Sequence, residues 1–428
     1  MGIFNLPGFI ITNIEENPHD YRISVSAAEK PSFCPRCGNR GIIAPHGGKL
    51  QLVRDIGING TKVSLLYDRK RYKCKSCAAT FLELNDNIEP KRRFTKRLVS
   101  YIEQQSLKKP FLQIAEEIGI SHTIVSNIFR DYVIKQESKY KIETPRILGI
   151  DELTASRPRA VILNVEENTI IELLPSLNKA TIVDFLRSLD NPSGVEVAVI
   201  DMRQTYRDAV KTVLRNADIV IDKFYVLRAA NSILNNIKID FKNTFTPAQQ
   251  KQLKKDKYML FKNSDALTLQ EKLIMESWFG MFPLLKKAYD LKEDLGLVFE
   301  SETAYEGKQK LQEWRQKIGN DTEPFMKLAE TMENWCPEIL NYFKYKVTNI
   351  HTESLNNIIR LIDSIGRGYS FEVLRAKVLF GVIHRIGIAE SEPKYGNSSK
   401  VIDYGVDIPT LVKTLGENIS KELPQKNR

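Results

Sequence analysis

The chain has 428 residues, which at about 150 residues per domain predicts about three domains. Apolar residues make up 42% and charged residues 27% of the sequence, so it fits a globular protein and excludes disordered, collagen-like and coiled-coil classes. No window approaches the roughly 18 consecutive apolar residues that a membrane span needs, and the first residues lack a signal-peptide pattern. We therefore expect a cytoplasmic protein without membrane partners.

Positive charge is concentrated in one stretch of the chain. The formal net charge is +10, and residues 62–97 alone hold eleven Lys and Arg against four Asp and Glu. A cluster of this kind suits a polyanion such as a nucleic acid. A solvated charged face explains the same composition equally well, so charge alone does not decide between the two.

Residues 1–88 are expected to form a small domain of strands and turns. Leu50–Ile56 and Lys62–Tyr67 alternate between apolar and polar residues as strands do, and Asn59-Gly60 between them is a typical hairpin turn. Two C-x-x-C pairs flank this hairpin and offer four thiolates: Cys34, Cys37, Cys74 and Cys77. Four thiolates complete a tetrahedral shell, which predicts a structural Zn²⁺ ion in a zinc ribbon.

The C-x-x-C spacing by itself also fits two roles without zinc. The pairs could be unrelated reduced cysteines, whereas a redox function would need a thioredoxin-like βαβ context that this region lacks. The fifth cysteine, Cys336, stands alone and is expected to be a core residue.

Residues 89–142 are expected to form a helix-turn-helix domain. Apolar residues recur at helical spacing from Phe111 to Ile118, Gly119 suits a helix end, and Ser121 suits the N-cap of a second helix. On that second helix Ile124, Val125, Ile128 and Tyr132 form the apolar stripe. The side chains expected to face DNA are His122, Thr123, Ser126, Asn127 and Arg130. The basic run ahead of them offers phosphate contacts from Arg92, Arg93, Lys96 and Arg97. The plainer alternative is an ordinary helical hairpin.

Residues 143–223 change to an α/β pattern in which two aspartates follow strands. Apolar runs predict strands at 147–150, 160–165, 170–174, 195–200 and 217–221, with helices at 179–189 and 206–215. Asp151 and Asp201 end two of these strands, at the edge of a sheet where ligands bind. Carboxylates that converge there favour Mg²⁺ or Mn²⁺. Asp222 ends a further strand and is the main rival of Asp201.

A third acidic ligand is expected on a helix near the end of the chain. Residues 224–346 carry long helical periodicity, and another amphipathic helix begins near His351. On that helix Glu353, Asn356, Asn357 and Arg360 share the face opposite the apolar stripe. Glu353 is therefore the expected third ligand, in a segment that we place at residues 347–392, and a polar tail follows at residues 393–428. His351 stays unassigned. For Asp151 and Asp201 a structural role is the alternative, because an aspartate after a strand is more often a turn residue than a catalytic one.

The order of these modules resembles bacterial insertion-sequence transposases of the DDE type, of the ISL-three family. The matching stretches are CPRCG, RYKCKSCAATF, the helix-turn-helix, LGIDE, VIDMRQTYRDAV, NADIVIDKFYVLRAAN, AYDLKEDL and TNIHTESLNNIIRLIDSIGRGYSFEVLR. The resemblance implies a multidomain fold, with an α/β ribonuclease H-like core interrupted by an all-α insertion at residues 224–346. It also implies that Asp151, Asp201 and Glu353 form the catalytic triad. Where the family usually has Asp-Arg-Phe-His, this chain has Asp222-Lys223-Phe224-Tyr225.

Two functional hypotheses follow. The first is a bacterial, nucleoid-associated transposase that binds the terminal inverted repeats of its own element and uses Mg²⁺ for strand cleavage and strand transfer, acting as a homo-oligomer on double-stranded DNA. The second is a DNA-binding regulator, or a transposase relic that binds DNA without cutting it. The presence of all three acids favours the first hypothesis.

Overall fold

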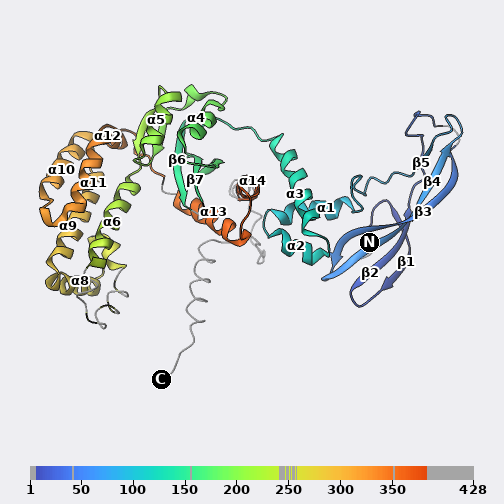
Figure 1. Ribbon diagram of the computed structural model, residues 1–428, viewed down its shortest axis with the longest axis horizontal. Helices are drawn as coiled ribbons and strands as arrows, with labels where there is room; N and C mark the ends of the chain where they lie inside the picture. The colour runs from blue at the N-terminus through green and yellow to red at the C-terminus, as the bar shows by residue number, and fades with distance from the viewer. Residues whose placement is uncertain are drawn as a thin grey trace, which may run out of the picture. The chain divides into compact units, whose positions relative to one another are not determined.

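The computed structural model describes most of the chain up to residue 382. The described residues are 6–40, 43–154, 157–240, 246, 250, 252, 256, 258–349 and 352–382. His351, the tail expected at residues 393–428 and the end of the segment expected at residues 347–392 lie outside them. Figure 1 shows the order of the helices and strands along the chain.

The N-terminal region is a five-stranded sheet with its own small core. Its strands are β1 (Phe9–Glu16), β2 (Asp20–Ala27), β3 (Ile43–Ile58), β4 (Thr61–Cys74) and β5 (Thr80–Leu82). The order is β1-β2-β4-β3, and β5 pairs with β4. The expected turn between β3 and β4 is confirmed, because Asn59 and Gly60 both have positive φ. Both strands run further than the apolar alternation predicts, since backbone pairing continues beyond the apolar core of Ile23, Val53 and Leu65.

Three helices follow: α1 (Lys96–Ser106), α2 (Phe111–Ile118) and α3 (His122–Glu137). The Ser121 hydroxyl accepts a hydrogen bond from the Ile124 N–H, so the predicted N-cap of α3 is confirmed. Gly119 ends α2 in the left-handed region at φ 74°, which a residue with a Cβ adopts only with strain. The helix end at Gly119 and the cap at Ser121 separate α2 from α3, and the two helices form the expected helix-turn-helix.

The central sheet is mixed and has the order β10-β9-β6-β7-β8. Its strands are β6 (Ile147–Thr154), β7 (Pro158–Asn164), β8 (Thr169–Leu174), β9 (Val197–Ile200) and β10 (Asp218–Ile221). β6, β7 and β8 pair antiparallel, whereas β9 and β10 run parallel to β6. The connections into the parallel strands carry α4 (Lys179–Arg187) and α5 (Gln204–Val213). All five predicted strands and both predicted helices of this segment are present.

A group of helices follows the last strand. Its members are α6 (Lys223–Asp240), α8 (Leu269–Met281), α9 (Pro283–Phe299), α10 (Ala304–Lys317), α11 (Glu323–Asn334) and α12 (Cys336–Tyr345). They lie beside one another in Figure 1. Their buried residues, Trp314 and Phe325 among them, form one hydrophobic cluster with the central sheet. The long helical periodicity after residue 224 thus corresponds to helices that pack onto the sheet's own core.

The last described elements are α13 (Thr352–Gly366), α14 (Phe371–Lys377) and a π-helical turn, η6 (Val378–Val382). They pack on the second face of the sheet. On β7, Ala160 and Ile162 belong to the cluster with the long helices, whereas Val161 and Leu163 belong to a cluster shared with α13, α14 and the helix-turn-helix. This alternation is the strand period of two, so both sheet faces are covered.

Lys377 is a buried contact between α14 and the helix-turn-helix. Its side chain is 1% exposed, and its Nζ donates hydrogen bonds to the carbonyls of Ser106 and Lys109. It also lies 5.1 Å from the centre of the Phe111 ring. Burial lowers the pKa of Lys377 to about 7. The helix-turn-helix therefore shares buried contacts with the sheet domain.

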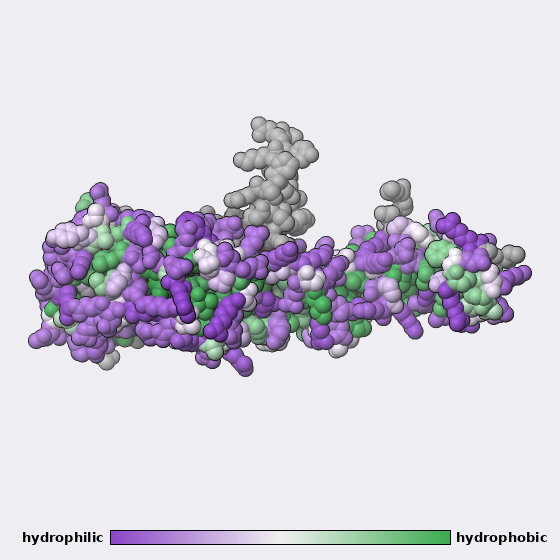
Figure 2. All heavy atoms as spheres, turned by 90° about the horizontal axis from the view of Figure 1, so that it is seen from above, coloured by the Kyte–Doolittle hydropathy of each residue, from purple (hydrophilic) through white to green (hydrophobic). Residues whose placement is uncertain are grey.

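On the face shown in Figure 2, hydrophilic residues predominate, as expected when most apolar side chains are in these cores.

Candidate functional site

The four paired cysteines come together as the spacing predicts. One sulfur atom from each of Cys34, Cys37, Cys74 and Cys77 lies within 4.8 Å of the others. The Cys34 and Cys77 sulfurs are 3.7 Å apart, and those of Cys37 and Cys74 are 3.9 Å apart. Four thiolates at about 2.3 Å from a Zn²⁺ ion have sulfur atoms about 3.8 Å apart. The cluster therefore has the dimensions of a tetrahedral zinc site.

The backbone builds both halves of this cluster in the same way. The Cys34 N–H donates to the Asn39 carbonyl and the Cys74 N–H donates to the Ala79 carbonyl, each at 2.9 Å. The residue after each pair, Gly38 or Ala78, has positive φ. A hydrogen bond from the Cys77 N–H is the main cause that lowers the pKa of Cys74 to about 6. The turns thus stabilise the thiolates of Cys34 and Cys74, the form that binds zinc, whereas the neighbouring sulfur atoms raise the pKa of Cys37 to about 11.

The outward face of α3 carries the side chains expected to read DNA. His122, Thr123, Asn127 and Arg130 are exposed, and Ser126 is half-buried. Val125 and Ile128 are buried as predicted, and so is Phe129, which the periodicity of the sequence does not single out. The Phe129 ring packs at 5.1 Å from the Phe111 ring of α2, so the apolar face is one residue wider than the minimal stripe.

The four basic residues before and within α1 fall into two groups. Arg93 and Lys96 are exposed. Arg92 instead pairs with Asp131 of α3 at 2.6 Å, and the Arg97 Nε donates to the buried Asp55 carboxylate of β3 at 2.8 Å. The Thr95 hydroxyl donates to the same carboxylate. Arg92 and Arg97 are therefore engaged in internal ion pairs, whereas Arg93 and Lys96 present their charges to solvent.

Three aspartates lie side by side at one edge of the central sheet. Ile150 of β6 pairs with Ile200 of β9, and Ile200 pairs with Ile221 of β10. The next residue on each strand is an aspartate: Asp151, Asp201 and Asp222. Neighbouring residues in one register row point to the same face, at strand separations of about 4.8 Å. We call these residues the acidic row. Its members are 9%, 8% and 4% exposed, respectively.

The acidic row is electrostatically unfavourable by itself. Burial, together with the negative charges of Asp151 and Asp222, raises the pKa of Asp201 to about 8. Burial also raises the pKa of Asp222 to about 6 and moves the pKa of Asp151 above its usual value. The exposed Arg228 of α6 opposes these shifts through its positive charge. Among the described Lys, Arg and His residues, none forms an ion pair with the acidic row.

Helix α13 lies against the acidic row with its polar face. The Asn356 Nδ2 donates to Asp151 Oδ2 at 2.7 Å, and the Arg360 Nε donates to the Thr154 carbonyl at 3.1 Å. Asn356 is 3% exposed, and its Oδ1 makes no hydrogen bond to a described residue. Glu353, one turn earlier on this face, is exposed.

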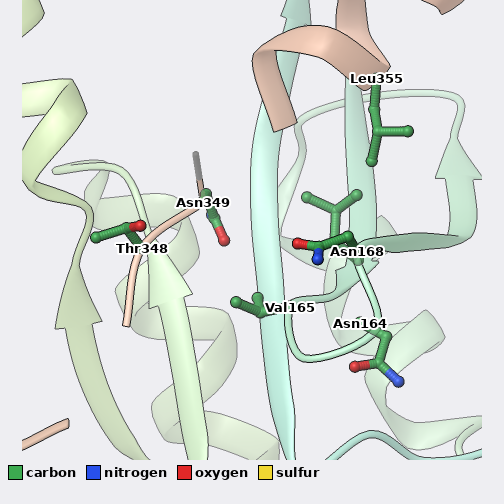
Figure 3. A pocket seen from close by; sticks show the side chains of 7 residues that line it. Asn164, Val165, Asn168, Thr348, Asn349 and Leu355 are labelled. Atoms are coloured by element: carbon green, nitrogen blue, oxygen red, sulfur yellow. The ribbon is translucent and has the colours of Figure 1, made fainter. Parts of the chain in front are cut away.

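The segment before α13 is held at the same edge of the sheet. The Asn349 N–H donates to the Asp222 carboxylate, which lowers the pKa of that group against the effect of burial. The Asn349 Oδ1 approaches β6 so closely that a Cβ on Gly149 would stand 3.0 Å from it. A small cavity, lined by residues including Asn349, Thr348, Val165 and Leu355, lies beside this contact (Figure 3). Gly149 thus permits the close approach of the Asn349 side chain to β6.

The acidic row and α13 offer only oxygen ligands for a metal ion. Carboxylates and a carboxamide oxygen suit Mg²⁺ or Mn²⁺, and the orphaned Asn356 oxygen next to Asp151 fits this purpose. Among the described residues, the cysteine cluster is the group in which three or more ligand atoms lie within 4.8 Å of one another. The structure thus brings Asp151, Asp201 and Asp222 into one row, although neither these three carboxylates nor any set that includes Glu353 meets this distance among the described residues.

Comparison with known families identifies the class of protein. Residues 30–77 match the zinc-finger of transposase IS204/IS1001/IS1096/IS1165, residues 86–133 match the helix-turn-helix domain of transposase family ISL3, and residues 148–378 match the ISL3 DDE family described as Transposase. These matches define a DNA-binding transposase. The longest covers more than half of the chain, so the chain belongs to the ISL3 family. No curated protein matches it. No described helix is both long and apolar enough to cross a membrane.

Proposed function

We propose that this transposase binds the terminal inverted repeats of its insertion sequence and catalyses Mg²⁺-dependent strand cleavage and strand transfer through Asp151, Asp201 and Glu353. The acidic row is the observation that carries this proposal. Buried carboxylates that repel one another at the edge of a sheet are costly unless divalent cations neutralise them. Mg²⁺, when bound, activates water or a 3′-hydroxyl and stabilises the leaving oxygen.

The strand order supports a ribonuclease H-like core for this chemistry. Three antiparallel strands followed by two parallel ones, in the order β10-β9-β6-β7-β8, are typical of that fold. In this proposal residues 143–223 and 347–392 form the core, and residues 224–346 are a helical insertion. The insertion packs onto the core, so it supports β10 and Asp222 from the side of the long helices.

Within the site, each side chain has a separate task. Asp151 and Asp201 hold the cations, and Asn356 orients the Asp151 carboxylate through its hydrogen bond. Glu353 lies one turn before Asn356 on α13, its side chain is exposed, and in this proposal it supplies the third carboxylate to the cations.

The N-terminal parts provide DNA recognition in this proposal. The zinc ribbon at residues 1–88 supports the neighbouring helix-turn-helix at residues 89–142. The second helix of that motif places five side chains in the major groove: His122, Thr123, Ser126, Asn127 and Arg130. Arg93 and Lys96 contact phosphates. Arg92 and Arg97 orient the domain through their ion pairs rather than by free charge. We further propose that the protein acts as a homo-oligomer that holds two element ends and the target DNA.

A nicking assay tests the proposal. Supercoiled DNA that carries the element's ends should be nicked at those ends with Mg²⁺ or Mn²⁺ and should stay intact with EDTA. Binding without nicking under all these conditions would instead favour a DNA-binding regulator or an inactive relic. That result would leave family membership and DNA recognition unchanged.

A further inference from the structure

Asp222 occupies a position that the proposed catalytic triad does not explain. It is the most buried member of the acidic row at 4% exposed, and it follows β10 in the same register row in which Asp201 follows β9. Its N–H continues the ladder by donating to the Ile200 carbonyl at 3.2 Å. Asp222 therefore stands beside Asp201 on the side away from Asp151.

A helix cap is the simplest structural role for Asp222, and it is not sufficient. The Asp222 Oδ1 accepts a hydrogen bond from the Phe224 N–H at 3.2 Å, at the start of α6, and the same carboxylate accepts one from the Asn349 N–H. Asn, Ser and Thr cap a helix as well as Asp does and carry no charge. The helix dipole favours a negative charge at this position by only about 0.3–1 kcal/mol, which is small compared with the cost of burying a carboxylate beside two others.

A second observation points to a ligand at this edge of the sheet. The Asn356 side chain is 97% buried, since it is 3% exposed, and it hydrogen-bonds to Asp151 through Nδ2. Its Oδ1 is left without a hydrogen-bond partner among the described residues. A buried acceptor without a donor costs free energy, and a cation or its bound water satisfies it. The acidic row thus has an unused neutral oxygen at its Asp151 end.

We propose that Asp222 is a ligand of the divalent-cation site, and that Asp201, in the middle of the row, is shared between Asp151 on one side and Asp222 on the other. This inference rests on the proposed function, because it concerns the same cations. A linear row of three carboxylates has two gaps between neighbours, and Asp201 borders both of them. The site would then hold one more carboxylate than the triad of Asp151, Asp201 and Glu353.

Manganese binding to the full-length protein tests this inference without reference to cleavage. Mn²⁺ is titrated into the wild type, Asp222→Asn and Asp201→Asn, with binding followed by electron paramagnetic resonance and calorimetry. Asp222→Asn keeps the cap of α6 and the shape of the residue, so its fold should persist. We expect its Mn²⁺ affinity to fall about tenfold or more, or one Mn²⁺ equivalent to disappear.

A matched control separates ligand loss from a general change of charge. Asp218→Asn removes a carboxylate from the other end of β10, where Asp218 pairs with Lys344 at 2.8 Å. This variant should bind Mn²⁺ as the wild type does. Wild-type binding by Asp222→Asn, alongside weakened binding by Asp201→Asn, would overturn this inference and leave the proposed function intact. Unchanged binding in both variants would overturn the proposed metal site itself.

Discussion

The cysteine cluster and the acidic row place metal-binding side chains together in opposite ways. In each half of the cysteine cluster a backbone turn donates N–H groups to the first sulfur, Cys34 or Cys74, and lowers the pKa of that thiol before any ion binds, whereas the neighbouring sulfur atoms raise the pKa of Cys37 to about 11. The acidic row stands on rigid strands, and burial and mutual repulsion raise the pKa of its central member to about 8. The first arrangement favours the charged form of Cys34 and Cys74, whereas the second opposes the charged form of all three aspartates.

This difference distinguishes a site that stabilises the fold from a site whose buried charges destabilise it. The N-terminal sheet has a small core, and a closed four-thiolate shell adds stability to it. The acidic row lies in a domain whose two sheet faces both carry large hydrophobic clusters. That domain can accommodate unfavourable buried charges, as functional sites often require. Substitutions in each site, and on the DNA-facing helix, test whether the two differ in this way.

The largest effect is expected at the cysteine cluster. Cys74→Ser should abolish zinc binding and unfold the N-terminal sheet, because structural Zn²⁺ contributes roughly 10 kcal/mol or more to the folding of small domains. Zinc content by mass spectrometry and the melting of the purified protein measure this. Cys336→Ser, a change outside the cluster, should keep one zinc per chain. A zinc-free Cys74→Ser protein that melts like the wild type would show that the cysteine cluster does not stabilise the fold, which would contradict the comparison with the acidic row.

At the acidic row we expect a substitution to abolish activity and to stabilise the metal-free fold, whereas at the cysteine cluster it destabilises the fold. Asp201→Asn should lower DNA cleavage by about three orders of magnitude or more, because it removes a metal ligand while keeping the shape of the residue. Without metal, the same change should raise the thermal stability slightly, since it removes the cost of burying this carboxylate and relieves its repulsion from Asp151 and Asp222. End binding should change little.

The other proposed ligands extend this test. Asp151→Asn and Glu353→Gln should reduce cleavage in the same way, and a double variant should lose little more than either single one. If Glu353→Gln kept full cleavage while Asp222→Asn abolished it, the acidic row alone would form the site. A drop in metal-free stability for Asp201→Asn would contradict the expected repulsion between the carboxylates.

The smallest effect is expected on the exposed face of α3. Asn127→Ala and Arg130→Ala should each cost about 1–3 kcal/mol on element ends and much less on random DNA, provided that they contact bases. Lys96→Ala is the control, because an exposed lysine that contacts phosphate should weaken binding to both kinds of DNA and reduce its salt dependence. Fluorescence anisotropy at several salt concentrations measures both. Equal losses on both DNAs for all three variants would place base reading elsewhere.

The parts of the fold that depend on local signals could be predicted well. The hairpin turn at Asn59-Gly60, the cap at Ser121 and the helix end at Gly119 are all present. The strand and helix segments between residues 147 and 221 also follow their apolar periodicity. Each of these features involves residues only a few positions apart, so short-range sequence patterns contain the information.

The partners of charged side chains could not be predicted in this way. Arg97 belongs to a basic run in the sequence, but it pairs with Asp55, 42 residues earlier. The helical pattern places Asn356 only on a helix face, whereas in the structure it hydrogen-bonds to Asp151, 205 residues earlier. Asp222 is a rival of Asp201 in the sequence, and the sheet makes the two neighbours. Such contacts depend on strand order and helix packing, which local periodicity does not contain.

The sequence by itself determined the types of element, the four zinc ligands, the N-cap of the exposed helix and the positions of the aspartates at strand ends. Only the tertiary structure decided which strands are neighbours, and therefore that β9 lies between β6 and β10. The physical reason is that hydrogen bonding and turn chemistry act over a few residues, whereas strand order minimises the exposed apolar surface of the whole chain. The acidic row exists because that long-range packing aligns three strands in one register.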